Sequence, residues 1–106
     1  MAKNKKQDED TAELVKILQE NYLSRHPEAR IDVYRYNSAS IRVRIIDPIF
    51  RTRNITRRDH EVWKILKKHA SEDLLEQLSV VLLLAPEELT TSLMNREFDD
   101  LRPSRL

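Results

Sequence analysis

The sequence contains no glycine and no cysteine among its 106 residues. Phosphate-binding loops, dinucleotide-binding turns, nucleophile elbows and calcium loops of the EF-hand type all need glycine. Their backbones adopt positive φ or approach a ligand too closely for a Cβ atom. These sites are therefore excluded in their usual form. The absence of cysteine also excludes disulfides, a thiolate nucleophile and cysteine ligands for zinc or an iron–sulfur cluster.

Long apolar segments are absent as well. The longest apolar run, Val80–Ala85, is far shorter than the roughly 18 residues that span a bilayer. The first ten residues lack the apolar region of a signal peptide. Hydrophobic residues make up 40% and charged residues 35% of the chain, and the net charge is +1. We therefore expect a globular, cytoplasmic protein without membrane contact.

The chain divides into an arm, one domain and a tail. Residues 1–10 carry three lysines, three acidic residues and no apolar anchor, so we expect a disordered arm. Leu14, Val15, Leu18 and Tyr22 recur at helical spacing and predict an amphipathic helix over about 11–23. The domain is expected to cover 11–98, and residues 99–106 are expected to be a frayed tail.

Two strands and a hairpin follow this helix. Apolar and polar residues alternate over residues 31–36 and again over 41–45, which is the pattern of half-buried strands. The connection at residues 37–40 has the length of a hairpin loop. Pro48 ends the second strand because proline cannot donate to the ladder.

The second half of the chain predicts two helices, a buried strand and a final helix. The basic loop 49–58 leads into a helix over about 57–69, with Thr56 and Asp59 at its start as a capping box. Ser71 caps a short helix, and Leu78–Leu84 reads as a buried strand. We expect Leu82→Asp to unfold the protein for that reason. Pro86 starts the last helix, with Leu89, Leu93 and Met94 on one face.

The predicted order is therefore α-β-β-α-α-β-α. Its simplest arrangement is one α+β domain, in which helices cover one face of a three-stranded mixed sheet.

The segment Ser40–Glu88 resembles the BolA family, whose class II KH-like fold has this order of elements. Residues 50–58, FRTRNITRR, match the family's Phe-x-Gly-Lys-x-Leu-x-x-Arg, and Val62-Trp63 stands where the family has Val-Tyr. Residues 85–88, Ala-Pro-Glu-Glu, are similar to the family's Thr-Pro-x-Glu. The resemblance implies a partner of monothiol glutaredoxins in iron–sulfur cluster trafficking; some members of the family bind DNA.

The residues that would ligate a cluster by this resemblance are missing. The family's histidine at the start of the last strand corresponds to residues 76–78, Glu-Gln-Leu, and its Cys or His is absent from the loop 37–40. Thr52 replaces the loop glycine, and the family's histidine after the loop arginine falls on Asp59. The resemblance thus implies the fold without iron–sulfur ligation, and a glutaredoxin-like partner only if the family role holds.

Charge is segregated along the chain. Residues 30–68 hold eight arginines and three lysines against four acidic residues, a net charge of +7. Residues 71–100 hold eight acidic residues against Arg96, a net charge of −7. Guanidinium groups beside a helix N-terminus favour phosphate, and we expect alanine at both Arg57 and Arg58 to remove nucleic-acid binding without unfolding the protein. The candidate contacts in the loop are Arg51, Arg53, Arg57 and Arg58.

The alternation of the first two strands gives a second candidate surface. If the apolar residues face the helices, then Tyr34, Tyr36, Arg42 and Arg44 share the opposite sheet face. Tyrosine and arginine on an open sheet stack bases and hold phosphates. The same residue types also suit a solvated face with internal ion pairs, or a protein or homodimer interface. The C-terminal helix covering this face is a further alternative.

No pattern supports catalysis or metal binding. His60 and His69 are nine residues apart and lie on opposite sides of a helix, and Trp63 is predicted to pack against the sheet. We therefore expect a non-enzymatic protein with no metal or other cofactor. The leading hypothesis is an adaptor or binding module that acts through a protein partner. The alternative is nucleic-acid binding through the arginine-rich loop and the Tyr/Arg sheet face.

Overall fold

The described residues form an α+β fold, as the sequence predicts, with three α-helices and one three-stranded sheet. A computed structural model describes residues 2–91, 95 and 98, with side chains from residue 9 onward. In chain order, the elements are α1 (Ala2–Leu18), the π-helical turn η1 (Gln19–Leu23), β1 (Arg30–Asn37), β2 (Ser40–Ile46), the 3₁₀ turn η2 (Pro48–Thr52), α2 (Ile55–His69), α3 (Glu72–Gln77), β3 (Leu78–Leu84) and the 3₁₀ turn η3 (Pro86–Thr90).

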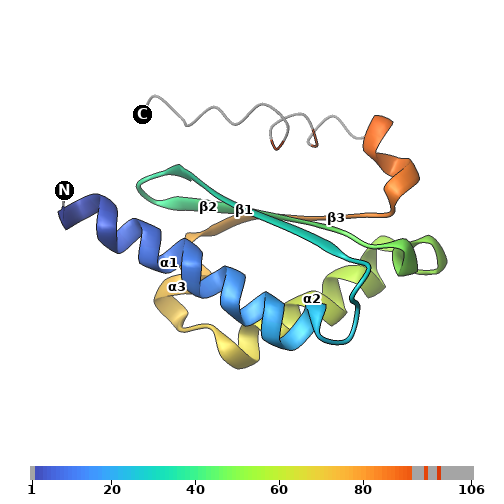
Figure 1. The fold of residues 1–106 in the computed structure, drawn as a ribbon, viewed down its shortest axis with the longest axis horizontal. Helices are drawn as coiled ribbons and strands as arrows, with labels where there is room; N and C mark the ends of the chain where they lie inside the picture. The colour runs from blue at the N-terminus through green and yellow to red at the C-terminus, as the bar shows by residue number, and fades with distance from the viewer. Residues whose placement is uncertain (1, 92–94, 96–97, 99–106) are drawn as a thin grey trace.

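The strands form one open mixed sheet in the order β1-β2-β3 (Figure 1). β1 and β2 are antiparallel and joined by the predicted hairpin, whereas β3 is parallel to β2. A parallel pair needs a crossover connection, and α2 with α3 supplies it. Val33, Val43 and Val81 occupy one row across the sheet, so β-branched side chains meet on the same face.

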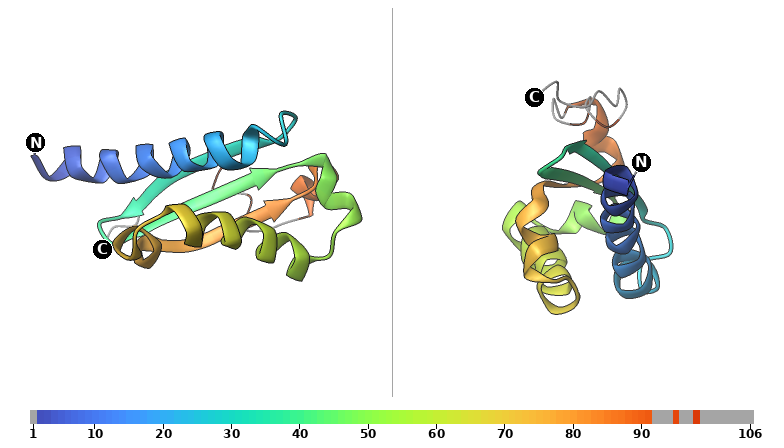
Figure 2. Two further views of the ribbon diagram at one scale, coloured as in Figure 1. Left: turned by 90° about the horizontal axis from the view of Figure 1, so that it is seen from below. Right: turned by 90° about the vertical axis from the view of Figure 1, so that its left-hand side faces the viewer.

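The helices α1, α2 and α3 all lie against one face of the sheet (Figure 2). This confirms the predicted one-sided arrangement and the inward set of β2, because Ile41, Val43 and Ile45 are completely buried. Burial of these side chains drives the packing of the layers. The helices contribute the other members of this core, which include Leu14, Leu18, Val62, Leu66 and Leu74.

α1 begins earlier than the sequence indicated. The helix starts at Ala2, so residues 2–10, expected to be an arm, continue the helix predicted from about residue 11. The stretch holds neither proline nor glycine, and its lysines and glutamate favour a helix. Asp10 also ties the helix to the domain, because it accepts a hydrogen bond from Gln77 (3.1 Å) and lies 3.7 Å from Arg35.

Two helix starts illustrate how capping sets boundaries. α2 begins at Ile55 because the Asn54 side chain accepts a hydrogen bond from the amide of Arg57 (2.9 Å). The predicted capping box at Thr56 and Asp59 is therefore wrong by two residues. Ser71 caps α3 as predicted, through a 3.1 Å hydrogen bond from the amide of Leu74.

The chain after β3 begins a helical segment where predicted, at Pro86. It forms the 3₁₀ turn η3, and Glu88 accepts a hydrogen bond from the amide of Ala85 (2.9 Å). Leu93, Met94 and the tail 99–106, for which predictions were made, lie outside the described residues. No helix in the described part of the chain has the length and apolar character needed to cross a membrane.

Candidate binding surfaces

The four arginines of the predicted phosphate site all contact acidic side chains of the same chain. A phosphate group would have to compete with these carboxylates, so the loop offers weaker anion binding than its composition indicates. The pairs are Arg51 with Glu87 (2.7 Å), Arg53 and Arg57 with Glu61, and Arg58 with Glu88 (2.7 Å).

Arg58 is a buried structural residue, only 6% exposed. Its guanidinium donates to the carbonyl oxygens of Phe50 (2.6 Å), Arg53 (2.9 Å) and Leu83 (3.1 Å). Together with the ion pair to Glu88, these bonds join η2, α2, β3 and η3. Arg58 therefore satisfies buried carbonyl groups of the fold, in place of the ligand contact that the sequence indicated.

Glu88 should make the protein sensitive to acid. The Arg58 guanidinium holds the pKa of Glu88 below its ordinary value of 4.5. The unfolded chain then binds the proton more readily, so this ion pair contributes stability above about pH 4.5 and loses it as the pH falls through the lowered pKa. Thermal unfolding of Glu88→Gln is expected to depend less on pH below 5 than unfolding of the wild type. Parallel pH profiles of the two proteins would contradict this.

The sheet face opposite the helices is not open at its centre. Arg44, predicted to lie on an exposed Tyr/Arg face, is only 2% exposed. It forms an ion pair with Asp32 (2.7 Å), donates to Asn95, and its guanidinium carbon lies 5.1 Å from the centre of the Phe98 ring. Asn95 and Phe98, which follow η3, cover this part of the sheet face. This agrees with the alternative in which the C-terminal region folds over the face.

The other three candidates on this face are half-buried. Tyr34 packs edge-on against Phe98, with 5.2 Å between the ring centres, and its burial raises the pKa of Tyr34. The Arg42 guanidinium lies 3.6 Å above the Tyr36 ring, nearer the hairpin. The structure thus brings the four sheet residues together on one face, as predicted. The arginine loop lies beyond the opposite end of β2, so the two sets do not form one surface.

A groove between η1 and α2 combines an apolar floor with a basic rim, and sequence patterns did not reveal it. Its volume is about 460 Å³. Arg25, Lys64 and Lys68 on the rim are exposed and form no ion pair within the described residues, whereas Glu61, the one carboxylate lining the groove, already binds Arg53 and Arg57. The lining consists of Asn21, Tyr22, Arg25, His26, Glu61, Lys64, Ile65, Lys68 and His69.

The groove floor is held by a buried hydrogen-bond network. The Tyr22 hydroxyl donates to Oδ2 of Asp47 (2.6 Å), and Asp47 also accepts from the amide of Ile49 (3.0 Å). His26 stacks on Tyr22 with 4.5 Å between ring centres, and its Nδ1 lies 3.6 Å from Asp47. Burial and the bond to Asp47 raise the pKa of Tyr22 above its ordinary value. The Tyr22 hydroxyl therefore stays protonated, and the network connects the floor to the end of β2.

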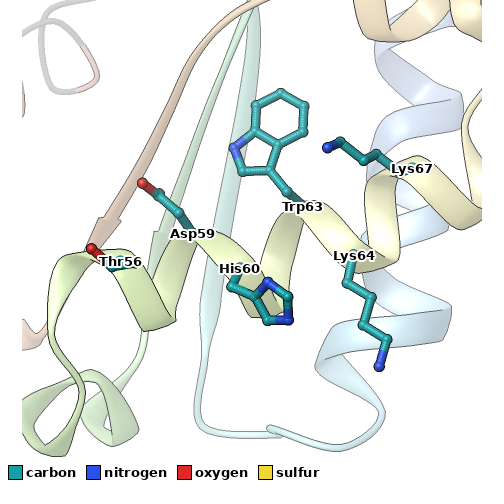
Figure 3. A pocket seen from close by; sticks show the side chains of 6 residues that line it. All are labelled: Thr56, Asp59, His60, Trp63, Lys64 and Lys67. Carbon is teal, nitrogen blue, oxygen red and sulfur yellow. The ribbon is translucent and has the colours of Figure 1, made fainter.

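A second pocket lies on α2 itself, with a volume of about 500 Å³ (Figure 3). Figure 3 shows Asp59, Trp63 and Lys67 on one flank of the helix and His60 and Lys64 on the other. Trp63 is half-buried and packs against the core, as predicted. Within the described residues, no group of three or more His, Asp or Glu side chains is arranged to hold a metal ion.

No model of a known protein family matches this chain, and no curated protein has a similar sequence.

Proposed function

We propose that this protein is a small, non-enzymatic binding module that acts through a protein partner, and that an acidic amphipathic segment of the partner docks between η1 and α2. The observation that carries this proposal is the groove. Its rim presents Arg25, Lys64 and Lys68, which form no ion pair within the described residues, above a floor that includes Tyr22 and Ile65. An acidic segment matches this arrangement, because its carboxylates meet the rim while its apolar side chains enter the groove.

The details of the groove favour a protein segment over nucleic acid. Tyr22 is only 2% exposed, so its ring offers no free face on which a base can stack. The arginines of the basic loop 49–58 also form ion pairs with Glu61, Glu87 and Glu88. The nucleic-acid alternative is supported instead by the Arg42 and Tyr36 pair near the hairpin, which has the residue types of a single-strand binding face.

The BolA resemblance remains part of the proposal. The element order supports a BolA-like module, with a glutaredoxin as one partner to test. At the position of the family's cluster ligand, the Gln77 side chain accepts from Arg35 (2.8 Å) and donates to Asp10 (3.1 Å). A side chain held in this way ties α3 to α1 and β1, which supports a binding role without iron–sulfur ligation.

Charge reversal in the groove is the test. We expect the double variant K64E/K68E to bind the partner with an affinity at least about tenfold lower than that of the wild type, because two attractive rim charges become repulsive. The partner is captured from nuclease-treated native lysate on immobilised wild-type protein, and its affinity is then measured by titration. Lys16 is exposed on α1, away from the groove lining, so K16E is the matched control and should bind like the wild type.

Two results would contradict the proposal. Equal capture by K64E/K68E and wild type would exclude the groove as the docking site. Loss of all captured material after nuclease, with a steep fall in affinity as salt rises, would instead support the nucleic-acid alternative.

A further inference from the structure

His26 lies between the groove and a buried carboxylate. It lines the groove between η1 and α2, and it also lines a neighbouring pocket of about 490 Å³. Asp47 lines that neighbouring pocket and is only 3% exposed. The Nδ1 atom of His26 lies 3.6 Å from Oδ2 of Asp47. The imidazole is therefore part of the groove wall and is backed by an acidic group that the groove itself does not expose.

The His26 ring is already held in one position. It stacks on Tyr22, with 4.5 Å between ring centres and 26° between ring planes. The amide of His26 donates to the carbonyl oxygen of Tyr22 (3.0 Å), and its carbonyl oxygen accepts from the amide of Ala29 (3.0 Å). The side chain is 24% exposed. A charge on this ring stays at the groove wall without the entropy cost of ordering a long side chain.

The other titratable groups around His26 come from three segments. Asp47 follows β2 and contacts the imidazole, whereas Glu61 of α2 lines the groove and already forms two ion pairs with arginines of the loop. Burial raises the pKa of Tyr22, so the ring stacked on His26 carries no charge. The remaining titratable residues that line the two cavities together with His26 are Arg25, Glu28, Lys64, Lys68 and His69.

Protonation of the imidazole changes both of its surroundings. Histidine side chains change charge between about pH 5 and pH 8. The protonated ring carries an N–H group at each nitrogen. The Nδ1–H then has the Asp47 carboxylate as its acceptor, and the Nε2–H is left for a carboxylate of a bound segment. Protonation thus adds one cation to a groove that already has a basic rim.

We propose that protonation of His26 strengthens the binding of the acidic segment in the groove, so that recognition tightens as the pH falls from about 8 to about 6. This regulation depends on the proposed function, because it acts on the same groove. Carboxylates of the segment keep their charge over this range, since their ordinary pKa values are about 4. Below about pH 5 they begin to take up protons, and the affinity should fall again.

Titration of the full chain with a synthetic acidic peptide is the test. The peptide carries glutamate and leucine on opposite faces of a helix, and a version with glutamine in place of glutamate is its uncharged control. The affinity of the wild type for the acidic peptide is expected to rise about threefold to fivefold from pH 8 to pH 6. The affinity for the glutamine peptide should not change over this range.

Variants of the histidines separate charge from packing. H26F keeps an aromatic ring on Tyr22 but takes up no proton, so its affinity should stay low at both pH values. H26K carries a permanent cation and should bind at both pH values as the wild type does at the lower one. H69F should keep most of the pH dependence, because His69 is exposed at the end of α2. His60 lines the pocket on α2 instead of the groove, so H60F is the matched control.

Nuclear magnetic resonance of the histidine rings gives a readout that a purely structural role of His26 would not move. The chain has three histidines, so these variants assign their signals. Because protonation and binding are linked, the acidic peptide should move the titration of His26 to higher pH by the same factor as the affinity gain.

The outcomes distinguish a failure of this regulation from a failure of the groove. A His26 ring that stays neutral down to about pH 5, or an H26F variant with the pH dependence of the wild type, would overturn the regulation and leave the groove as the docking site. Equal binding of the acidic peptide by K64E/K68E and wild type, or no binding by the wild type, would overturn both. Circular dichroism of each variant separates lost binding from a lost fold.

Discussion

Replacing Arg58 with alanine is expected to lower the free energy of unfolding by about 3 to 5 kcal/mol. Arg58 is 6% exposed, and its guanidinium donates to three backbone carbonyl groups besides pairing with Glu88. Alanine removes those bonds, including the one to the buried Leu83 carbonyl, and leaves Glu88 without its cation, although the Phe50 carbonyl keeps its bond from the amide of Arg53. Denaturant unfolding followed by circular dichroism measures the loss.

Arg57 is the matched control, because it is the next residue in α2 and its side chain is 62% exposed. R57A should change the free energy of unfolding by no more than about 0.5 kcal/mol. Equal stabilities of R58A and R57A would show that Arg58 is not the buried tie between elements. The sequence predicted that the variant with alanine at both Arg57 and Arg58 keeps its fold. The burial of Arg58 predicts instead that this variant is strongly destabilised. A loss of binding by this variant would therefore report unfolding.

The second large effect is expected at Leu83. This side chain is 7% exposed and belongs to the core on the helix-facing side of β3. Leu83→Asp places a carboxylate among apolar side chains, where ionisation without a partner costs several kcal/mol or more. We expect the variant to be unfolded at neutral pH. The measurement is the near-ultraviolet circular dichroism spectrum, compared with that of the wild type.

Leu82→Asp is the control for this prediction, and it revises the expectation drawn from the sequence. Leu82 is half-buried on the sheet face away from the core, since the register of β3 pairs it with Arg44. The substitution should therefore be less destabilising than Leu83→Asp. If Leu82→Asp unfolds the protein while Leu83→Asp does not, the assignment of the two faces of β3 is wrong.

Charge segregation was the main functional signal in the sequence, and the fold gives it a different meaning. The basic middle of the chain and its acidic end indicated an open anion-binding surface. Glu87 and Glu88 of the acidic end instead pair with Arg51 and Arg58 of the basic loop. Two blocks of opposite charge within one domain can neutralise each other, and composition alone does not show whether they do.

The cations that form no ion pair in the described part of the chain are less prominent in the sequence. Lys64 and Lys68 lie four residues apart in α2, a common pattern on any solvated helix. Their place above Tyr22 and Ile65 depends on how η1 packs against α2. A spacing of four residues predicts that two lysines share a helix face, but it does not predict the groove beside them.

The elements that the sequence predicted by itself are those specified by local patterns. Alternation over residues 31–36 and 41–45 predicted the hairpin, and the apolar run predicted β3, because residues close in the chain share the geometry that produces the period. The tertiary structure alone decided which polar groups are buried. Arg44 meets Asn95, 51 residues away, and Arg58 meets Glu88, 30 residues away. The energy of such pairs depends on the distance and dielectric of the folded chain, and neither quantity is encoded in local spacing.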